Sequence, residues 1–291
     1  MSWRTVVIRE RAKLDYKMNY MIVRRSDDIK RISISELYMV ILESTAVSIT
    51  AVLLNELNKN KVSVVFCDEK RSPYANLIGL YGSHDTSLKY RLQTKWQEYT
   101  MQEVWTKIVY EKIKNQYLVL KKLNLEGYHK LMDYLEELEF NDVTNREGHA
   151  AKIYFNSLFG KDFSRSQECF VNAALNYGYS ILLSSFNREI NASGYATQFG
   201  IFHNNQYNSF NLSCDLMEPY RVLVDLIVYN LKGSEFESMH KNIIIKLLND
   251  YVVIEGKKQT VANSIKIYTK SIFRVLNNDD ISQLSFFDYE L

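Results

Sequence analysis

The hydrophobic pattern of the chain changes near residue 84, from short runs typical of strands to a spacing typical of helices. Before this point, β-branched and aromatic residues gather in short runs bounded by polar residues, which favours strands. After it, apolar residues recur every three or four positions, as on one face of a helix. The pattern predicts an α+β protein, in which a small β-rich N-terminal domain (1–83) precedes a larger all-α C-terminal domain (84–291).

Within the first domain the sequence predicts one hairpin and one helix. The runs Tyr20–Val23 and Ile29–Ile34 flank a polar turn at 26–28 and are expected to pair. A helix is expected over about 50–58, with Val52, Leu53 and Leu57 on one side. Further strands are expected at Trp3–Ile8, Tyr38–Leu42 and Lys61–Phe66.

The second domain is expected to be helical almost throughout. From Asp85 a helical spacing runs through Leu88, Leu92, Trp96 and Tyr99 and on to Ile108. Between Phe186 and Ser213 a polar, Asn-rich stretch predicts a turn-rich connection. The tail Leu284–Leu291 is expected to fray, with docking on a partner as the alternative. Further helices are expected near 129–139, 148–158, 167–186, 217–231, 237–249 and 261–276.

Composition excludes several classes of protein. Of 291 residues 46% are hydrophobic, and only 2 Pro and 10 Gly are present, so collagen-like and low-complexity chains are excluded. The net charge of +2 excludes a histone-like binder but not a protein with a local DNA-binding surface. Three scattered cysteines argue against a disulfide framework or a zinc ribbon. No signal peptide and no membrane-spanning run are visible, so we expect a soluble, cytoplasmic protein.

Glu147 is the first residue that could carry chemistry. On a helix it shares a face with Ala150, Ala151, Tyr154 and Leu158, which places a carboxylate at the head of an apolar face. Burying a lone charge in this way is costly. A structural alternative is a capping box, in which the preceding Thr at 144 and Glu147 close the start of the helix.

A second acidic group lies in the segment 215–225. Asp215, Glu218 and Asp225 fall on one helical stripe, with Arg221 beside it. Here too a cap is the alternative, with Asp215 as N-cap and Glu218 three residues later. His203 lies in a polar loop, where a lone histidine is usually solvated.

Carboxylates and one imidazole together suggest a site for a hard cation. Oxygen ligands suit Mg²⁺ or Mn²⁺, and an imidazole ligand favours Mn²⁺ slightly. Such an ion would reverse the repulsion between carboxylates and a phosphodiester. No P-loop, GxSxG or HExxH motif is present, which excludes the corresponding NTPases, hydrolases and zinc proteases.

Four motifs follow one another along the chain: Glu147-Gly-His-Ala-Ala-Lys-Ile-Tyr, Asn172-Ala-Ala-Leu-Asn-Tyr177-Gly-Tyr, Gly200-Ile-Phe-His203 and Asp215-Leu-Met-Glu218-Pro-Tyr-Arg221-x-x-x-Asp225. In this order they resemble the motifs of the CRISPR-associated spacer-acquisition integrases, over nearly the whole chain and most closely those of the type II-A subgroup. Tyr220 and Val222 depart from the usual Phe and Pro of that family, which alters packing more than chemistry.

The resemblance implies an enzyme, a metal-dependent DNA endonuclease and integrase, that joins a 3′-hydroxyl of short foreign DNA to a CRISPR repeat by transesterification. It implies a metal triad of Glu147, His203 and Glu218 that holds Mg²⁺ or Mn²⁺. It also implies a homodimer built through the β-domains, which assembles with a small adaptation partner protein and double-stranded DNA. Asn172 and Tyr177 match family positions close to the site, and Asp215 is expected to orient the ligands.

Basic residues near the domain junction are the expected contacts to the DNA backbone. His84, Arg91 and Lys95 would share a helix face with Leu88, and the family places basic residues here. The alternative is a solvated amphipathic face. Weaker candidates for phosphate contact are Arg146 and Arg221. Two other functions stay open: a stand-alone metal-dependent nuclease acting on branched DNA, and a non-catalytic DNA-binding assembly subunit.

Overall fold

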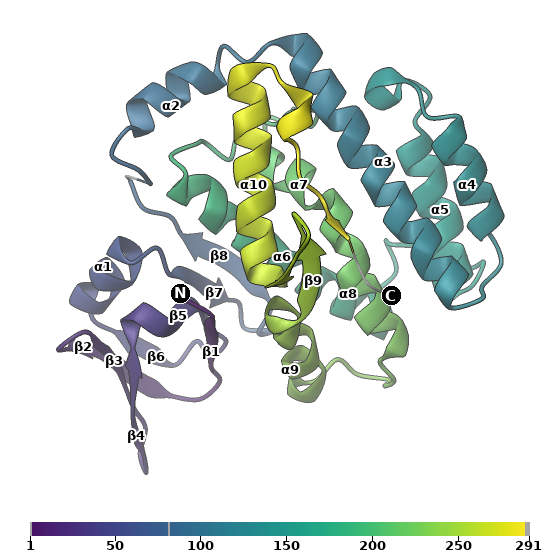
Figure 1. The fold of residues 1–291 in the computed structure, drawn as a ribbon. Coiled ribbons are helices and arrows are strands. Elements are labelled where there is room, and N and C mark those ends of the chain that lie inside the picture. The colour runs from purple at the N-terminus through teal and green to yellow at the C-terminus, as the bar shows by residue number, and fades with distance from the viewer. Residues whose placement is uncertain (1, 81, 289–291) are drawn as a thin grey trace. The chain divides into compact units, whose positions relative to one another are not determined.

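Two sheets at the N-terminus and a mostly helical remainder confirm the predicted α+β class (Figure 1). The computed structural model describes residues 2–80 and 82–288. It divides into two units: one extends to Thr86 and includes the short segment Asn191–Gly194, and the other comprises Ser87–Ile190 and the residues from Tyr195 onward.

The first sheet has the strand order β1-β5-β7-β8. The first three strands are parallel to one another, and β8 is antiparallel to β7. All six residues of β5 are buried, as is typical of a central strand in a parallel sheet. The strands are β1 (Arg4–Ile8), β5 (Leu37–Leu42), β7 (Ser63–Cys67) and β8 (Pro73–Leu77).

The second sheet has the order β4-β3-β2-β6 and contains the predicted hairpin. β3 (Tyr20–Arg24) and β4 (Ile29–Ser33) are antiparallel, which confirms that hairpin. β2 (Ala12–Lys17), which the sequence analysis missed, pairs with β3 on one side and with β6 (Val47–Ile49) on the other. A 3₁₀ turn, η1 (Ile34–Glu36), leads from β4 to β5.

Helix α1 (Ala51–Lys59) confirms the predicted helix of the first unit. Its N-cap is Thr50, whose hydroxyl accepts a hydrogen bond from the backbone N–H of Leu53 at 3.4 Å. Leu53 and Leu57 are buried in the core of this unit. Val52 is 57% exposed, so placing it on the same side as Leu53 and Leu57 was wrong: it lies about 100° around the helix from Leu53.

Helices dominate the chain after Thr86. None of those in the described part combines the length and apolarity that crossing a bilayer requires. They are α2 (Thr86–Gln93), α3 (Glu98–Lys122), α4 (Tyr128–Glu136), α5 (Arg146–Phe159), α6 (Phe170–Ala192), α7 (Asn211–Met217), α8 (Arg221–Asn230), α9 (Ser238–Lys246) and α10 (Val261–Asn278), with 3₁₀ turns η2 (Phe140–Asp142), η3 (Glu218–Tyr220), η4 (Leu247–Asn249) and η5 (Ile281–Gln283).

The helix expected from Asp85 to Ile108 is broken into α2 and α3. The amide of Gln93 is buried and bonds the backbone of Ala196 with both its oxygen and its nitrogen, at 2.9 Å each. Trp96 is buried between the helices, with its indole 5.6 Å from the ring of Tyr195. These tertiary contacts of the linker override its helical spacing.

The shared face predicted for His84, Leu88, Arg91 and Lys95 is wrong for the same reason. His84 precedes α2, Arg91 lies on it, and Lys95 follows its end at Gln93. The side chains therefore do not line one helix.

The second unit is not all-helical, because it contains a small sheet of order β10-β9-β11. β9 (Tyr251–Ile254) and β10 (Lys257–Thr260) form a hairpin, and Glu255 and Gly256 both have positive φ in its two-residue turn. β11 (Phe287–Asp288) pairs with the other edge of β9. The tail is therefore not frayed up to residue 288, and residues 289–291 lie outside the described part of the chain.

Candidate active site

Glu147 lies in the first turn of α5, but it does not form the predicted capping box. The N-cap is Asn145, whose side chain accepts a hydrogen bond from the N–H of Gly148 at 3.3 Å. Asp142 accepts the N–H of Glu147 at 3.1 Å. The hydroxyl of Thr144 is buried and finds no partner among the described residues, so the capping box is wrong. Asp142 and Asn145 satisfy the helix start and leave the carboxylate of Glu147 for another contact.

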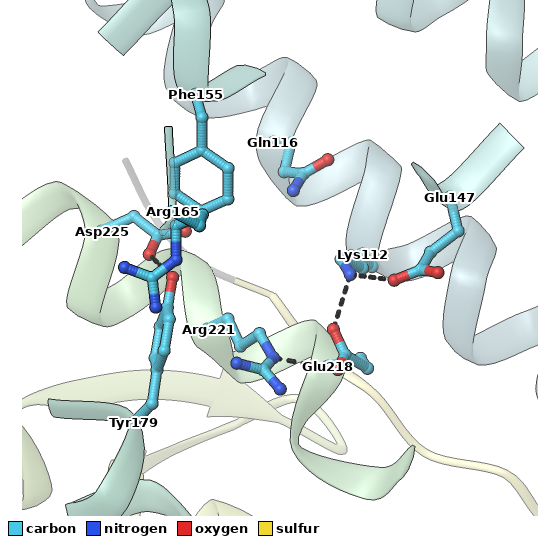
Figure 2. Close-up of a pocket in the computed structure, with 9 residues that line it drawn as sticks. All are labelled: Lys112, Gln116, Glu147, Phe155, Arg165, Tyr179, Glu218, Arg221 and Asp225. Atoms are coloured by element: carbon cyan, nitrogen blue, oxygen red, sulfur yellow. Dashed lines mark hydrogen bonds and ion pairs between the residues drawn. The ribbon is translucent and has the colours of Figure 1, made fainter. Parts of the chain in front are cut away.

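The apolar face of α5 packs inward as predicted. Ala150, Tyr154 and Leu158 are buried. Glu147 heads this face, and its Oε1 accepts a hydrogen bond from Nζ of Lys112 on α3 (Figure 2).

Glu218 lies in η3, the 3₁₀ turn that joins α7 to α8, and Pro219 occupies an early position where no N–H is needed. The carboxylate of Glu218 is 5% exposed and forms ion pairs with two cationic side chains, with Nε of Arg221 at 2.9 Å and with Nζ of Lys112 at 2.6 Å. Burial alone would raise the pKa of Glu218, but the charges and hydrogen bonds of Arg221 and Lys112 lower it to about 2. Glu218 is therefore ionised at any physiological pH.

Lys112 connects the two glutamates. It comes from the middle of α3, its side chain is 9% exposed, and it donates to both carboxylates (Figure 2). Burial would lower the pKa of Lys112, but the charges of Glu218 and Glu147 outweigh burial and raise it. The ammonium is therefore charged.

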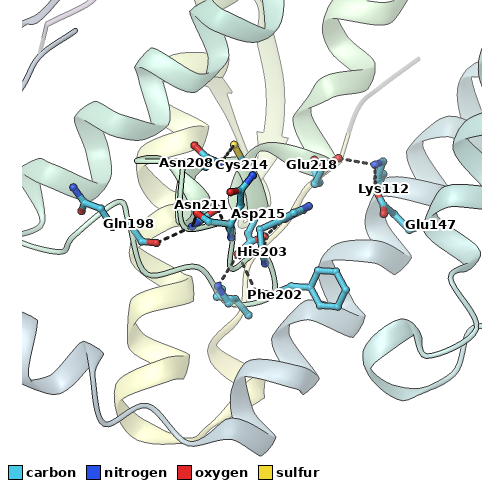
Figure 3. A network of polar contacts seen from close by, with 12 residues as sticks. Lys112, Glu147, Gln198, Phe202, His203, Asn208, Asn211, Cys214, Asp215 and Glu218 are labelled. Carbon is cyan, nitrogen blue, oxygen red and sulfur yellow. Dashed lines mark hydrogen bonds and ion pairs between the residues drawn. The ribbon is translucent and has the colours of Figure 1, made fainter. Parts of the chain in front are cut away.

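Asp215 is fully buried inside α7, which begins at Asn211, so the predicted N-cap role is wrong. Its carboxylate instead accepts the backbone N–H of Ile201 at 2.6 Å and of Phe202 at 3.0 Å (Figure 3). The ring of Phe202 stacks on Trp105 of α3, with 4.4 Å between centroids. The loop before α7 is thus fixed at its backbone and at one side chain.

This loop presents His203. Nδ1 of His203 lies 2.5 Å from Oδ1 of Asp215, and the ring is partly exposed. The hydrogen bond to Asp215 raises the pKa of His203 against the effect of burial, and the charges of Glu218 and Glu147 add to the rise. Because Nδ1 faces Asp215, Nε2 is the nitrogen left for a ligand.

Glu147 and Glu218 line a pocket of about 210 Å³. Its wall carries three basic and three acidic side chains, a composition that suits a phosphodiester held beside a cation. The lining residues are Lys112, Gln116, Glu147, Phe155, Arg165, Tyr179, Glu218, Arg221 and Asp225.

Asp225 forms the buried end of this pocket. It accepts a hydrogen bond from the hydroxyl of Tyr179, whose ring lies 4.6 Å below the guanidinium of Arg221. Burial raises the pKa of Asp225 to about 7, although the Tyr179 hydrogen bond and the Arg221 charge act in the opposite direction.

Asn172 acts on this pocket through Arg165. Its amide nitrogen donates at 2.8 Å to the carbonyls of Ser164 and Gln167, and its oxygen accepts from Arg165. Arg165 also bonds Asn176 at 2.7 Å. Asn172 therefore holds the loop that aims Arg165 into the pocket.

The remaining predicted site residues lie away from the pocket lining. Tyr177 packs 5.6 Å from the ring of Phe236, on another side of α6 from Tyr179. Arg146 pairs with Glu137 at 3.1 Å. Arg91 and Lys95 are exposed, and so is His84 in the first unit.

Sequence reasoning missed Lys112, Arg165 and Tyr179. Lys112 carried a signal: it follows Ile108 by four residues on the apolar face of α3, where a lysine is out of place. Arg165 carried no such signal, because it lies in a loop.

No three His, Cys, Asp or Glu side chains of residues 2–80 and 82–288 are gathered as a metal-binding group. Glu147 and Glu218 are joined through the ammonium of Lys112, whereas His203 is not among the residues that line their pocket. The donor set still fits a divalent ion: both carboxylates already converge on one cation, and His203 is oriented by Asp215 as metal-bound histidines are.

Residues 5–241 match the family described as CRISPR associated protein Cas1, a span that includes Glu147, His203 and Glu218. The CRISPR-associated endonuclease Cas1 of Neisseria meningitidis serogroup C (strain 8013) is 31% identical over 291 residues, which cover 98% of this chain and 95% of that protein.

Two solved structures are similar to the chain. A casposase bound to integration product has a TM-score of 0.77 at 17% identity, covering 97% of this chain and 92% of its own. A Cas6-RT-Cas1–Cas2 complex has a TM-score of 0.76 at 18% identity, covering 99% of this chain and 36% of a longer one. At these identities the two structures support the fold alone.

Proposed function

Because the chain belongs to the Cas1 family of CRISPR-associated proteins, an endonuclease and integrase family of spacer acquisition, we propose that its reaction takes place at Glu147, His203 and Glu218. There a 3′-hydroxyl of a short DNA fragment attacks a phosphodiester at the edge of a CRISPR repeat. The observation that carries this site is the convergence of two carboxylates, from α5 and η3, on one cation beside a pocket lined by Arg165 and Arg221.

Glu147, His203 and Glu218 would hold Mg²⁺ or Mn²⁺. The ion would polarise a phosphoryl oxygen and offset negative charge in the transition state. Glu218 supplies a carboxylate that stays ionised, because its pKa is lowered to about 2. Asp215 keeps the proton of His203 on Nδ1, so that Nε2 presents its lone pair.

The basic side chains of the pocket would hold the phosphodiester. Arg221 is fixed between Glu218 and the face of Tyr179, and Arg165 is fixed by Asn172 and Asn176. A guanidinium fixed in this way loses less freedom when it binds a phosphate than a mobile one does. We propose that Tyr177 acts through packing behind this wall.

Family membership is the basis of the assembly that we propose. One of the similar structures is a complex that contains Cas2, and we propose that this chain also forms a homodimer through its β-rich domain and joins a small partner protein on double-stranded DNA. His84, Arg91, Lys95 and Arg146 are the proposed contacts to the DNA backbone, with Arg221 at the reacting phosphate. Membership of the type II-A subgroup and a cytoplasmic location remain predictions.

The two alternative functions differ from integration in whether they require a repeat, the partner protein and a metal ion. A stand-alone nuclease on branched DNA would cut without a repeat and without the partner. A non-catalytic subunit would bind DNA and lack metal-dependent chemistry. The direct test is a strand-transfer assay on a supercoiled plasmid that carries a repeat, with and without the small partner and Mg²⁺ or Mn²⁺.

Glu147→Gln, His203→Ala and Glu218→Gln should each abolish integration, and EDTA should do the same to the unaltered chain. Glu136→Gln, on the exposed surface of α4, is the matched control and should integrate normally. Integration that persists in a Glu147→Gln or Glu218→Gln variant, and still depends on metal, would remove that residue from the site.

A further inference from the structure

We propose that Lys112 is an internal counter-ion of the metal site, which a divalent ion must displace in order to bind. The inference rests on the proposed ligation of metal by Glu147 and Glu218, and it adds a residue that sets the affinity of that site.

The contacts of Lys112 are those expected of a substitute cation. Its Nζ donates to Glu218 at 2.6 Å and to Glu147, and these two carboxylates come from different elements, η3 and α5. Without a cation between them, two ionised carboxylates would repel each other. Glu218 is 5% exposed and Glu147 is 23% exposed, so water screens that repulsion only in part.

An ammonium and a divalent ion cannot share these oxygens. A charged lysine has three donors and no lone pair, so it cannot join the coordination of a metal. It would also repel a doubly charged ion held at the same oxygens. Binding of the ion is therefore an exchange, in which the charge of Lys112 leaves the carboxylates.

The pocket beside Lys112 offers space for the displaced ammonium. Lys112 borders the 210 Å³ pocket, and its four-carbon side chain can turn while α3 stays in place. The displaced charge would join Arg165 and Arg221 on the wall where we place the phosphodiester. Lys112 is thus a positioning residue for the carboxylates before metal binds.

The test measures Mn²⁺ affinity by calorimetry, with the full chain and no DNA. Lys112→Met removes the charge, and Lys112→Gln removes it while keeping a hydrogen-bond donor. We expect both variants to bind Mn²⁺ at least tenfold more tightly than the unaltered chain, and Lys112→Arg to bind it no more tightly. Lys114→Met is the matched control: it removes the same charge from α3, where Lys114 contacts Glu111 instead, and should leave the affinity unchanged.

Thermal unfolding gives a second readout. Without metal, the neutral variants should melt below the unaltered chain, and Mn²⁺ should raise their melting temperatures more than it raises that of the unaltered chain. If they do not fold without metal but fold with Mn²⁺, the exchange is supported. If they do not fold with Mn²⁺ either, Lys112 serves only the fold and the proposal is overturned.

Equal or weaker Mn²⁺ binding by folded neutral variants also overturns the proposal. The proposed metal site fails by a different result: no Mn²⁺ binding by the unaltered chain, or binding that Glu147→Gln and Glu218→Gln leave unchanged.

Discussion

The carboxylate of Asp215 holds His203 twice, through the ring nitrogen Nδ1 at 2.5 Å and through the backbone N–H at 3.2 Å. Two further backbone N–H groups of the same loop, those of Ile201 and Phe202, donate hydrogen bonds to this carboxylate. One buried side chain therefore sets both the position of the loop and the tautomer of its histidine.

Asp215→Asn tests this role, since it keeps the shape of the side chain and loses its charge. We expect Mn²⁺ affinity to fall by about 10–100-fold, as is typical when the partner of a metal-bound histidine is lost. Calorimetry on the full chain measures it, with Asp162→Asn on the exposed surface as control. An unchanged affinity would mean that His203 needs no orienting partner.

Asp225 should make stability depend on pH. Its pKa is 3.8 in an unfolded chain and about 7 when folded, so the folded chain holds an extra proton between these values. Stability should therefore fall as pH rises from about 4 to 7, by up to about 4 kcal/mol at ~1.4 kcal/mol per pH unit. Asp225→Asn cannot ionise and should lose this part of the slope, which urea unfolding at pH 5 and pH 8 can measure. Equal slopes in the two chains would contradict the raised pKa.

The start of α5 should depend on Asn145 and not on Thr144. Asn145 caps the helix from the left-handed region, at φ 53°, so Asn145→Ala loses the cap and adds backbone strain. We expect it to lower the free energy of unfolding by about 2 kcal/mol. Asn145→Gly relieves the strain and should cost less. Thr144→Val, which removes only a buried hydroxyl without a described partner, should be neutral or slightly stabilising. The reverse order in urea unfolding would restore Thr144 as the cap.

Arg91 and Lys95 should affect DNA affinity without regard to DNA sequence. Arg91→Ala and Lys95→Ala should each reduce the slope of log affinity against log salt by about 1, if each contacts one phosphate. Lys130→Ala removes an exposed charge paired with Asp133 at 3.4 Å and serves as control. Salt slopes equal to that of the unaltered chain would leave the two residues as solvated surface.

Short-range periodicity predicted the parts of the fold that depend on neighbours in sequence. The hairpin of β3 and β4, the buried Leu53 and Leu57 of α1, and the apolar face of α5 follow from spacings of two, three or four residues. The β9–β10 hairpin was missed because each strand has only four residues, and because Glu255 adopts a positive φ that its residue type does not suggest.

The two capping interpretations failed because polar groups compete for partners that the sequence does not rank. Asp142 reaches forward five residues to Glu147 and leaves Thr144 without a role. Asp215 reaches back fourteen residues to Ile201, which no local motif indicates. The sequence marks Thr144 and Asp215 as polar residues close to helix starts, while the partners of their side chains depend on tertiary contacts.

The aromatic packing behind Glu218 comes from residues that follow it at a distance in the sequence. Tyr220, two residues after Glu218, is buried with its ring 4.4 Å from Phe287 of β11 and 5.6 Å from Tyr268 of α10. Synthesis reaches Tyr268 and Phe287 only after Glu147, His203 and Glu218, so a growing chain contains all three proposed metal-binding residues before the aromatic packing behind Glu218 can form. We expect that a growing chain does not cut DNA, and that nuclease activity appears only once synthesis has passed residue 287.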